Sequence, residues 1–224
     1  MKNKKHLIIA PHPDDEILGC GGIIAKYTQR NDFVYVLVLT RGIPSLFSDE
    51  SVENVRKECL EAHKLLGVTK TIFLDFPAPA LDSVPIYEIS NQIAKVITEI
   101  RPENLFLPHR GDIHNDHYVT FKAGLVAARP VNNNSVKNIY CYETLSETEW
   151  AAPFADDAFI PNVFENIEGA FIESKCKAME KFASQLRPFP SSRSLKTIRS
   201  LAAFRGSTVG FTCAEAFMLI RSIV

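Results

Sequence analysis

The sequence predicts a single α/β domain over residues 1–224, with a Rossmann-like, doubly wound and mostly parallel sheet flanked by helices. Two observations lead to this prediction. Short apolar runs of strand length alternate with longer stretches whose apolar residues recur every three or four positions, the period of a helix. The chain has 224 residues, of which 46% are hydrophobic and 23% charged, and this is enough for one large core.

The first two thirds of the chain carry the regular part of this pattern. Strands are expected, in order, at residues 7–10, 33–40, 71–74, 104–108 and 139–142. Helices are expected between them at residues 17–30, 51–66, 86–100 and 118–128. Gly67 is typical of the position after a helix, and Pro102 closes the third helix. Because helices separate the strands, the strands should run parallel, with the functional loops at their carboxyl ends.

The pattern loosens after residue 142. Residues 143–168 are expected to form a long loop, which could contain an edge strand and could line an active site. Helices are then expected at residues 174–185 and 193–204. A turn at Gly206 and Gly210 precedes a last apolar segment, residues 214–223.

Composition narrows the classes of function. Lys and Arg number 25 against 26 Asp and Glu, so bulk charge does not favour binding to nucleic acids or membranes. The five cysteines are scattered and form no C-x-x-C pair, which is typical of a reducing compartment. The apolar run after the basic N-terminus is too short for a signal peptide or a membrane span. We therefore expect a cytoplasmic protein without a membrane span.

A cluster of one imidazole and three carboxylates follows the first expected strand. It consists of His12, Asp14, Asp15 and Glu16. Histidine and carboxylate side chains bind Zn²⁺, and a catalytic zinc site has three protein ligands and one open position. Taken alone, however, the segment could equally be a proline-flanked turn whose aspartates cap the next helix.

A second cluster, residues 109–117, follows the fourth expected strand. Taken alone it would rather be a solvated loop that enters a helix with Asp116 as its cap. Because the carboxyl ends of parallel strands lie at the same edge of a sheet, the two clusters can meet there. Four of the six histidines of the chain fall in these two places, and this concentration favours a metal site. They are His12, His109, His114 and His117.

The residues themselves suggest a division of tasks. His12 and Asp15 can supply two ligands, and a histidine of the second cluster can supply the third. Asp14 then need not bind the metal and could take a proton from the water that the metal activates.

The two clusters together resemble the paired motifs of the PIG-L/LmbE-like zinc N-deacetylases. The motifs are His-Pro-Asp-Asp-Glu at residues 12–16, followed by glycines, and His-x-Asp-His at residues 114–117. The resemblance covers nearly the whole chain. Further similar segments are residues 56–58, 65–68, 101–102, 183–185, 205–206 and 214–217.

The resemblance implies a role for each of these residues. The implied ligands of zinc, or of another divalent metal such as Fe²⁺, are His12, Asp15 and His117. Asp14 would be the general base, and His114, held by Asp116, would stabilise the oxyanion or act as an acid. Either Asp14 or His114 could return the proton to the departing amine. The implied reaction removes the acetyl group from an N-acetylglucosamine-type amino sugar or its conjugate, and the protein could be a homo-oligomer.

Four further residues are candidates for substrate binding. Arg56 could bind a sugar hydroxyl or a phosphate, or could pair with a nearby glutamate on the surface. His109 and Asp112 could support the metal ligands or be ordinary loop residues. Glu143 and the loop after it could contact substrate or form an ordinary crossover connection.

Two other functions are weighed against the deacetylase. One is a non-catalytic, metal-containing sugar-binding module, which would not need Asp14 and His114. The other is a metal-dependent hydrolase of a different bond, such as a phosphoesterase. A single site of two histidines and one aspartate predicts one metal ion, whereas two-metal phosphoryl chemistry usually needs more ligands.

Overall fold

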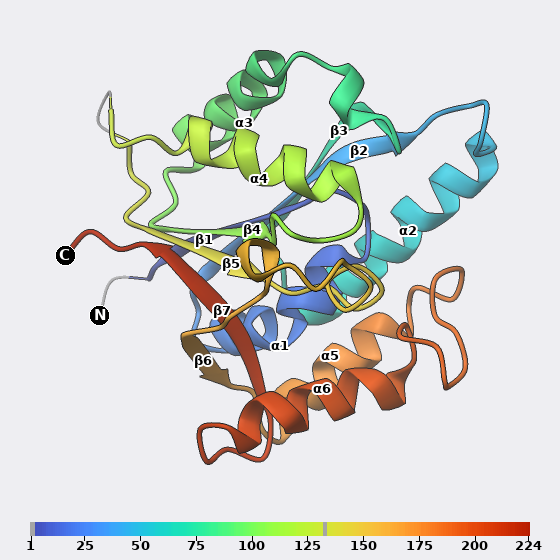
Figure 1. The fold of residues 1–224 in the computed structure, drawn as a ribbon, viewed down its shortest axis with the longest axis vertical. Coiled ribbons are helices and arrows are strands. Elements are labelled where there is room, and N and C mark those ends of the chain that lie inside the picture. Colours follow the sequence, from blue (N-terminus) through green and yellow to red (C-terminus); the bar gives the residue numbers. More distant parts are fainter. Residues whose placement is uncertain (1–2, 132–133) are drawn as a thin grey trace.

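The computed structural model describes residues 3–131 and 134–224. In these residues a seven-stranded sheet lies between two layers formed by six α-helices, so the predicted fold class is confirmed (Figure 1). The strands are β1 (Lys5–Ala10), β2 (Phe33–Gly42), β3 (Lys70–Ala78), β4 (Asn104–Pro108), β5 (Asn138–Tyr142), β6 (Val163–Asn166) and β7 (Ala214–Arg221). The helices are α1 (Asp15–Gln29), α2 (Asp49–Leu66), α3 (Ile86–Ile100), α4 (Asn115–Ala127), α5 (Ala170–Met179) and α6 (Leu195–Ser207).

The order of the strands places the two histidine clusters at the centre of one sheet edge. The order is β3-β2-β1-β4-β5-β7-β6, with parallel pairing from β3 to β5 and antiparallel pairing on both sides of β7. The winding reverses direction between β1 and β4, which are direct neighbours. Open α/β sheets bind ligands at such a switch point, beyond the carboxyl ends of the strands. The first cluster directly follows β1, and the second cluster directly follows β4.

The structure confirms the five predicted strands and the first four helices, with small shifts at their ends. The long loop after β5 does contain an edge strand, β6, and the last apolar segment forms β7 between β5 and β6. The fifth helix begins and ends earlier than predicted. The chain turns into α5 at Gly169, whose φ of 63° suits glycine, and Phe182 is buried in the turns that follow the helix.

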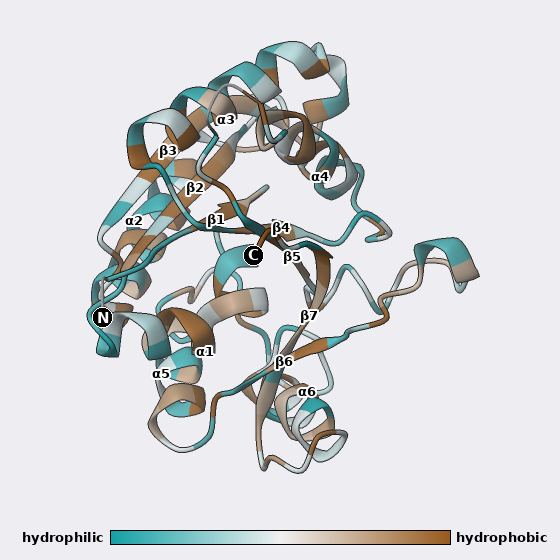
Figure 2. Ribbon diagram, turned by 90° about the vertical axis from the view of Figure 1, so that its left-hand side faces the viewer, coloured by the Kyte–Doolittle hydropathy of each residue, from teal (hydrophilic) through white to brown (hydrophobic). Residues whose placement is uncertain are grey.

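The core has two halves, one on each face of the sheet. Alternate side chains of β1 point to opposite faces. Ile8 packs in the half covered by α1, α2, α5 and α6, whereas Leu7 and Ile9 pack in the half covered by α3 and α4. Figure 2 shows the brown, hydrophobic strands between helices that carry hydrophilic colour on their outer sides. Burial on both faces explains why β1 reads as a continuous apolar run.

The helices of the described residues include no candidate for a membrane crossing, because each is too short or too polar.

Close packing of α1 on β5 generates a stability prediction. A Cβ atom at Gly19 would overlap the ring of Tyr142, which is fully buried and donates a hydrogen bond to the Ile9 carbonyl at 2.9 Å. Gly19→Ala should therefore lower the free energy of unfolding by about 1–3 kcal/mol through overpacking, although alanine favours helix. Chemical denaturation measures this. The control is Asn91→Ala, at an exposed position of α3, whose free energy of unfolding should stay within about 0.5 kcal/mol of the wild-type value. A Gly19→Ala protein as stable as wild type would contradict the packing described.

Candidate functional site

The first cluster lies where β1 ends and α1 begins. The fully buried Asp15 carboxylate closes this turn, because its Oδ2 accepts a hydrogen bond from the His12 backbone N–H at 2.9 Å. The same turn brings the His12 imidazole to the carboxylate, with Nδ1 3.2 Å from Asp15 Oδ2. One aspartate thus holds the backbone and the side chain of His12.

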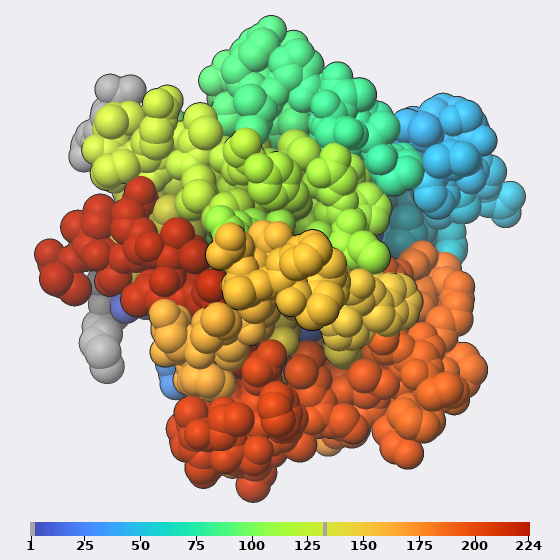
Figure 3. Space-filling view, in the orientation of Figure 1, coloured from blue at the N-terminus to red at the C-terminus, as the bar shows by residue number. Residues whose placement is uncertain are grey.

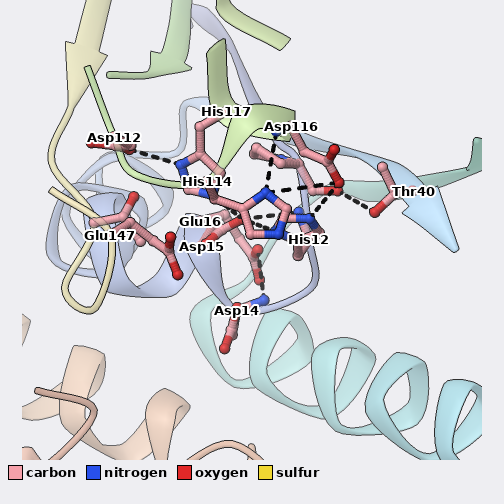
Figure 4. A network of polar contacts seen from close by, with 12 residues as sticks. His12, Asp14, Asp15, Glu16, Thr40, Asp112, His114, Asp116, His117 and Glu147 are labelled. Carbon is pink, nitrogen blue, oxygen red and sulfur yellow. Dashed lines mark hydrogen bonds and ion pairs between the residues drawn. The ribbon is translucent and has the colours of Figure 1, made fainter. Parts of the chain in front are cut away.

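The second cluster lies at the start of α4 and reaches the first one. His114 is the N-cap residue of α4, and its Nδ1 accepts a hydrogen bond from the Asp116 backbone N–H at 3.2 Å. One turn further on, His117 is completely buried, with Nε2 3.3 Å from Asp15 Oδ2. The predicted meeting of the two strand ends is therefore present in the structure (Figure 4).

Each of the two imidazoles that face Asp15 has another carboxylate at its far nitrogen. His12 Nε2 donates to Asp116 Oδ2 at 3.0 Å, and His117 Nδ1 donates to Asp112 Oδ2 at 2.7 Å. In the neutral tautomers that these bonds select, His12 Nδ1 and His117 Nε2 carry lone pairs on the side of Asp15. A carboxylate at the far nitrogen is the usual support of a metal-binding histidine.

These donor atoms fit a metal ion. His12, Asp15 and His117 each offer one ligand atom, and the three atoms lie within 4.8 Å of one another. Asp15 Oδ1 and His117 Nε2 are buried without a well-formed hydrogen bond in the part of the chain that the structure describes, and the one polar approach to His117 Nε2 is that of Asp15 Oδ2 at 3.3 Å. Such buried polar atoms are costly unless another group, here a cation, binds them.

A second set of donors is equally compact but less suited to a metal. It consists of His12, His114 and Asp116. Both oxygens of Asp116 already accept hydrogen bonds, one from His12 and one from the Leu81 backbone N–H at 3.0 Å. The set that contains Asp15 is therefore the better candidate.

The charges around the site favour a cation. Burial disfavours a charged imidazole at His12 and His117, but the neighbouring carboxylates outweigh it. They raise the pKa of His12 to about 9 and the pKa of His117 to about 10. Burial likewise opposes the charge of Asp15, yet the two histidines hold its pKa well below the ordinary value. A site that attracts protons so strongly also attracts a divalent metal.

Asp14 lies beside the donor set in a strained backbone conformation. Its φ of 114° and ψ of −27° lie in the left-handed region, and such a conformation costs on the order of 1–3 kcal/mol. Although Asp14 is the N-cap of α1, its side chain makes no capping hydrogen bond. Its carboxylate instead lies 3.1 Å from Arg193 Nη1. Burial raises the pKa of Asp14 to about 8, against the opposing charge of Arg193.

A cavity of about 320 Å³ opens next to these groups. Its lining includes His12, Asp14, His114, Glu147 and Arg193. The rest of the lining comes from the end of β2 and the loop after it, the first half of α2, the end of β3 and the segment before α6. Figure 3 shows the segment after β5, coloured yellow to gold, lying over the middle of the molecule between α4 and α6.

Two predicted residues lie at the cavity or beside the donor set. Arg56 lines the cavity, and its guanidinium lies over the Phe73 ring. Its ion pair is with Asp75, at 2.6 Å, and not with a glutamate of its own helix. Asp112 supports His117, as described above.

The structure does not bring two other predicted residues to the cavity. His109 is buried, and its Nε2 donates to the Asp157 carbonyl at 2.7 Å, so it anchors the long loop after β5. Both carboxylate oxygens of Glu143 pair with Arg205, at 2.8 and 2.7 Å. Neither residue is among those that line the cavity in the described part of the chain.

Asp116 holds His114 through its backbone N–H, whereas its carboxylate faces another histidine. Asp116 Oδ2 lies 4.0 Å from His114 Nδ1 but 3.0 Å from His12 Nε2, so the carboxylate supports His12. The pKa of His114 is lowered, by burial first and then by the charge of His12. His114 is therefore not held as a cation.

Arg193 and Glu147 were not predicted from the sequence. Arg193 contacts Asp14, donates from Nε to Ser146 Oγ at 2.8 Å, and lies 3.5 Å from Glu147. Glu147 lies in the loop after β5, the segment that the sequence indicates as a possible lining of an active site, and Arg193 lies in the turns before α6, at the first residue of the helix expected over residues 193–204. No local pattern in the sequence distinguishes them from surface residues.

Comparisons with known proteins bear on this geometry. The sequence model of the PIG-L family, described as GlcNAc-PI de-N-acetylase, matches residues 7–128, which contain both clusters. An uncharacterized deacetylase of Escherichia coli K12 is 30% identical over 82% of this chain and 92% of its own length. A probable N-acetyl-alpha-D-glucosaminyl L-malate deacetylase of Bacillus anthracis is 28% identical over 83% of each chain. The solved N,N'-diacetylchitobiose deacetylase of Pyrococcus horikoshii has a TM-score of 0.77 at 26% identity, covering 97% of this chain and 84% of that one.

The donor set predicts a metal-dependent gain in stability. Zn²⁺ added to chelator-treated protein should raise the melting temperature, because a ligand at 100 times its dissociation constant stabilises a fold by about 2.7 kcal/mol. Asp15→Asn and His117→Gln should lose most of this gain in differential scanning fluorimetry. His109→Gln is the control, because His109 is a buried histidine of the same connection that does not face the set. A zinc response that survives in both ligand variants would exclude this site.

Proposed function

The chain belongs to the PIG-L family of deacetylases, and we propose that it is a metal-dependent hydrolase of N-acetylated amino sugars. It would remove the N-acetyl group from an N-acetylglucosamine-type sugar or its conjugate, giving acetate and a free amine. The observation that carries the proposal is a donor set for one metal, with Asp15 and His117 buried, and an unligated carboxylate, Asp14, that lines the cavity beside it. The names of the Bacillus and Pyrococcus relatives support the substrate class.

We assign the metal, zinc or another divalent ion such as Fe²⁺, to His12, Asp15 and His117. When bound, the ion would act as a Lewis acid on the amide carbonyl and lower the pKa of water to about 7. Asp112 and Asp116 hold the two imidazoles in the tautomers that binding requires.

Asp14 serves as the general base in this proposal. Its carboxylate lines the cavity and takes a proton from the attacking water as the new C–O bond forms. Burial raises its pKa to about 8, which makes it a stronger base than an exposed aspartate. When the C–N bond breaks, Asp14 passes this proton to the departing amine, because a neutral His114 is a poor acid.

His114 serves as a hydrogen-bond donor to the oxyanion. Its Nδ1 accepts from the Asp116 backbone N–H, so the proton of the neutral ring is on Nε2. A neutral donor agrees with its lowered pKa. A fixed donor of this kind stabilises the charge that develops on the carbonyl oxygen.

The rest of the cavity suits a sugar. Arg41, Asn54 and Gln185 offer polar groups for hydroxyls, and Arg56 does so beside its ion pair with Asp75. Phe47, which also lines the cavity, offers an apolar surface to a sugar ring. We propose a small amino-sugar substrate.

We also propose a cytoplasmic location. The five cysteines of the chain all lie in described residues and are free, four of them buried. Free thiols are usual where the compartment is reducing.

The proposal is tested by acetate release from a panel of N-acetylated sugars. The panel should contain N-acetylglucosamine, N,N'-diacetylchitobiose, nucleotide sugars and lipid-linked sugars. Zinc-loaded protein should release acetate and free amine from at least one member, and a chelator should abolish release. Release that continues undiminished in the chelated protein would contradict the metal mechanism, and no release from any member would contradict the function.

The role assigned to Asp14 predicts a large kinetic effect with little effect on metal binding. Asp14→Asn should lower kcat by about 10²–10⁴-fold, because the amide cannot accept the proton of the water. Zinc content, measured by atomic emission after dialysis, should stay that of wild type, since Asp14 is not in the donor set. Asp156→Asn, an exposed change in the loop after β5, is the control and should keep wild-type kcat. Undiminished turnover in the Asp14 variant would remove Asp14 from the mechanism.

A further inference from the structure

A buried polar network lies next to the first cluster, and its members are not among the described residues that line the cavity. Glu16 and Cys59 are completely buried, and His63 is 2% exposed. His63 Nε2 donates to Glu16 Oε1 at 2.9 Å, and the Thr71 hydroxyl lies 2.7 Å from His63 Nδ1. Because a carboxylate can only accept, the imidazole proton is on Nε2, and Thr71 donates to Nδ1. The network therefore ties α1 to α2 and β3 through one carboxylate.

The other oxygen of the same carboxylate reaches the backbone of the proposed base. Glu16 Oε2 accepts a hydrogen bond from the Asp14 backbone N–H at 3.2 Å. This N–H stands at the beginning of α1, where backbone donors have no partner within the helix. In the capping box, a glutamate three residues after the N-cap accepts a hydrogen bond from the N-cap N–H. Glu16 makes the same bond from two residues after the N-cap, Asp14.

The Asp14 backbone needs such a restraint. Its φ of 114° and ψ of −27° are disfavoured for a residue with a side chain. Strained conformations of this kind persist where surrounding contacts hold them. In this conformation the Asp14 side chain points to the cavity and Arg193 and does not cap the helix.

We propose that His63 is a positioning residue for the general base. It fixes the Glu16 carboxylate, Glu16 fixes the peptide group of Asp14, and that peptide group aims the Asp14 carboxylate at the cavity. The inference rests on the role proposed for Asp14 above. His63 touches neither the cavity nor the donor set in the described residues, so its influence passes through Glu16.

A metal site is the other interpretation of this network, and the contacts favour positioning. Glu16, Cys59 and His63 offer three ligand atoms within 4.8 Å of one another. Both oxygens of Glu16 and both nitrogens of His63 have hydrogen-bond partners, however. In the described residues, none of the three is among the buried atoms without a partner, in contrast to Asp15 and His117.

The test compares two substitutions of His63. His63→Leu removes both hydrogen bonds, and its kcat should fall at least tenfold while KM and zinc affinity stay within about twofold. A misplacement of about 1 Å at a reacting group can cost about 10²-fold. His63→Gln, whose side-chain N–H group can reach Glu16, should recover most of the lost kcat. In a crystal structure of the leucine variant, φ of Asp14 should leave the left-handed region.

The control separates positioning from a loss of stability. Cys20→Ala creates a small cavity in α1, in the same core half but without a bond to the network. It should lower the melting temperature and leave kcat unchanged. Wild-type kcat in folded His63→Leu, or an equal loss in His63→Leu and His63→Gln, would overturn the proposal.

Two further measurements keep the test decisive. If His63→Leu does not fold, Thr71→Val replaces it in the test. This variant removes only the hydroxyl that orients the imidazole, and it should lower kcat with KM unchanged. Wild-type kcat in Thr71→Val would overturn the proposal. If the wild-type protein deacetylates no sugar, the proposed function fails. The crystal structure of the variant then still decides whether His63 holds the backbone of Asp14.

Discussion

The shared carboxylate of Asp15 is the interaction on which the site depends. Its Oδ2 binds the His12 backbone N–H and lies within 3.3 Å of one imidazole nitrogen from each strand end. These groups can meet because β1 and β4 are parallel neighbours at the point where the winding of the sheet reverses. A buried carboxylate needs a compensating positive charge. The same requirement explains the raised pKa values of His12 and His117 and the fit of the set to a divalent cation.

Three consecutive acidic residues have three different tasks in this arrangement because each has a different partner. Asp14 faces Arg193 and the cavity, Asp15 faces two histidines, and Glu16 points into the core toward His63. A regular helix start could not separate them so widely. The left-handed backbone at Asp14 makes the separation possible, and the hydrogen bond from its N–H to Glu16 is one contact that opposes the strain.

Much of the fold and the part of the site that the two histidine clusters form could be predicted from the sequence, for identifiable reasons. The strands are buried on both faces, so each appears as a short apolar run, and motifs directly after such runs had to lie at one sheet edge. The meeting of His12 with a histidine of the second cluster follows from that, whereas the choice of His117 came from the family resemblance. Other contacts depend on how the irregular chain after β5 folds back, and no short-range pattern in the sequence encodes that path. These are the contacts of Arg193, Glu147 and Glu143. The partner of Asp116 was missed because His12 and His114 are both within its reach.

The mechanism depends on one metal ion that joins the two strand ends, and a crystal structure of the zinc-loaded protein with anomalous diffraction at the zinc edge is the decisive experiment. We expect a single strong anomalous peak about 2.0–2.3 Å from His12 Nδ1, an Asp15 carboxylate oxygen and His117 Nε2, with Asp14 outside the coordination sphere. A peak between His114 and Asp116, a peak in the Glu16–Cys59–His63 network, or no peak at the Asp15 carboxylate would contradict it.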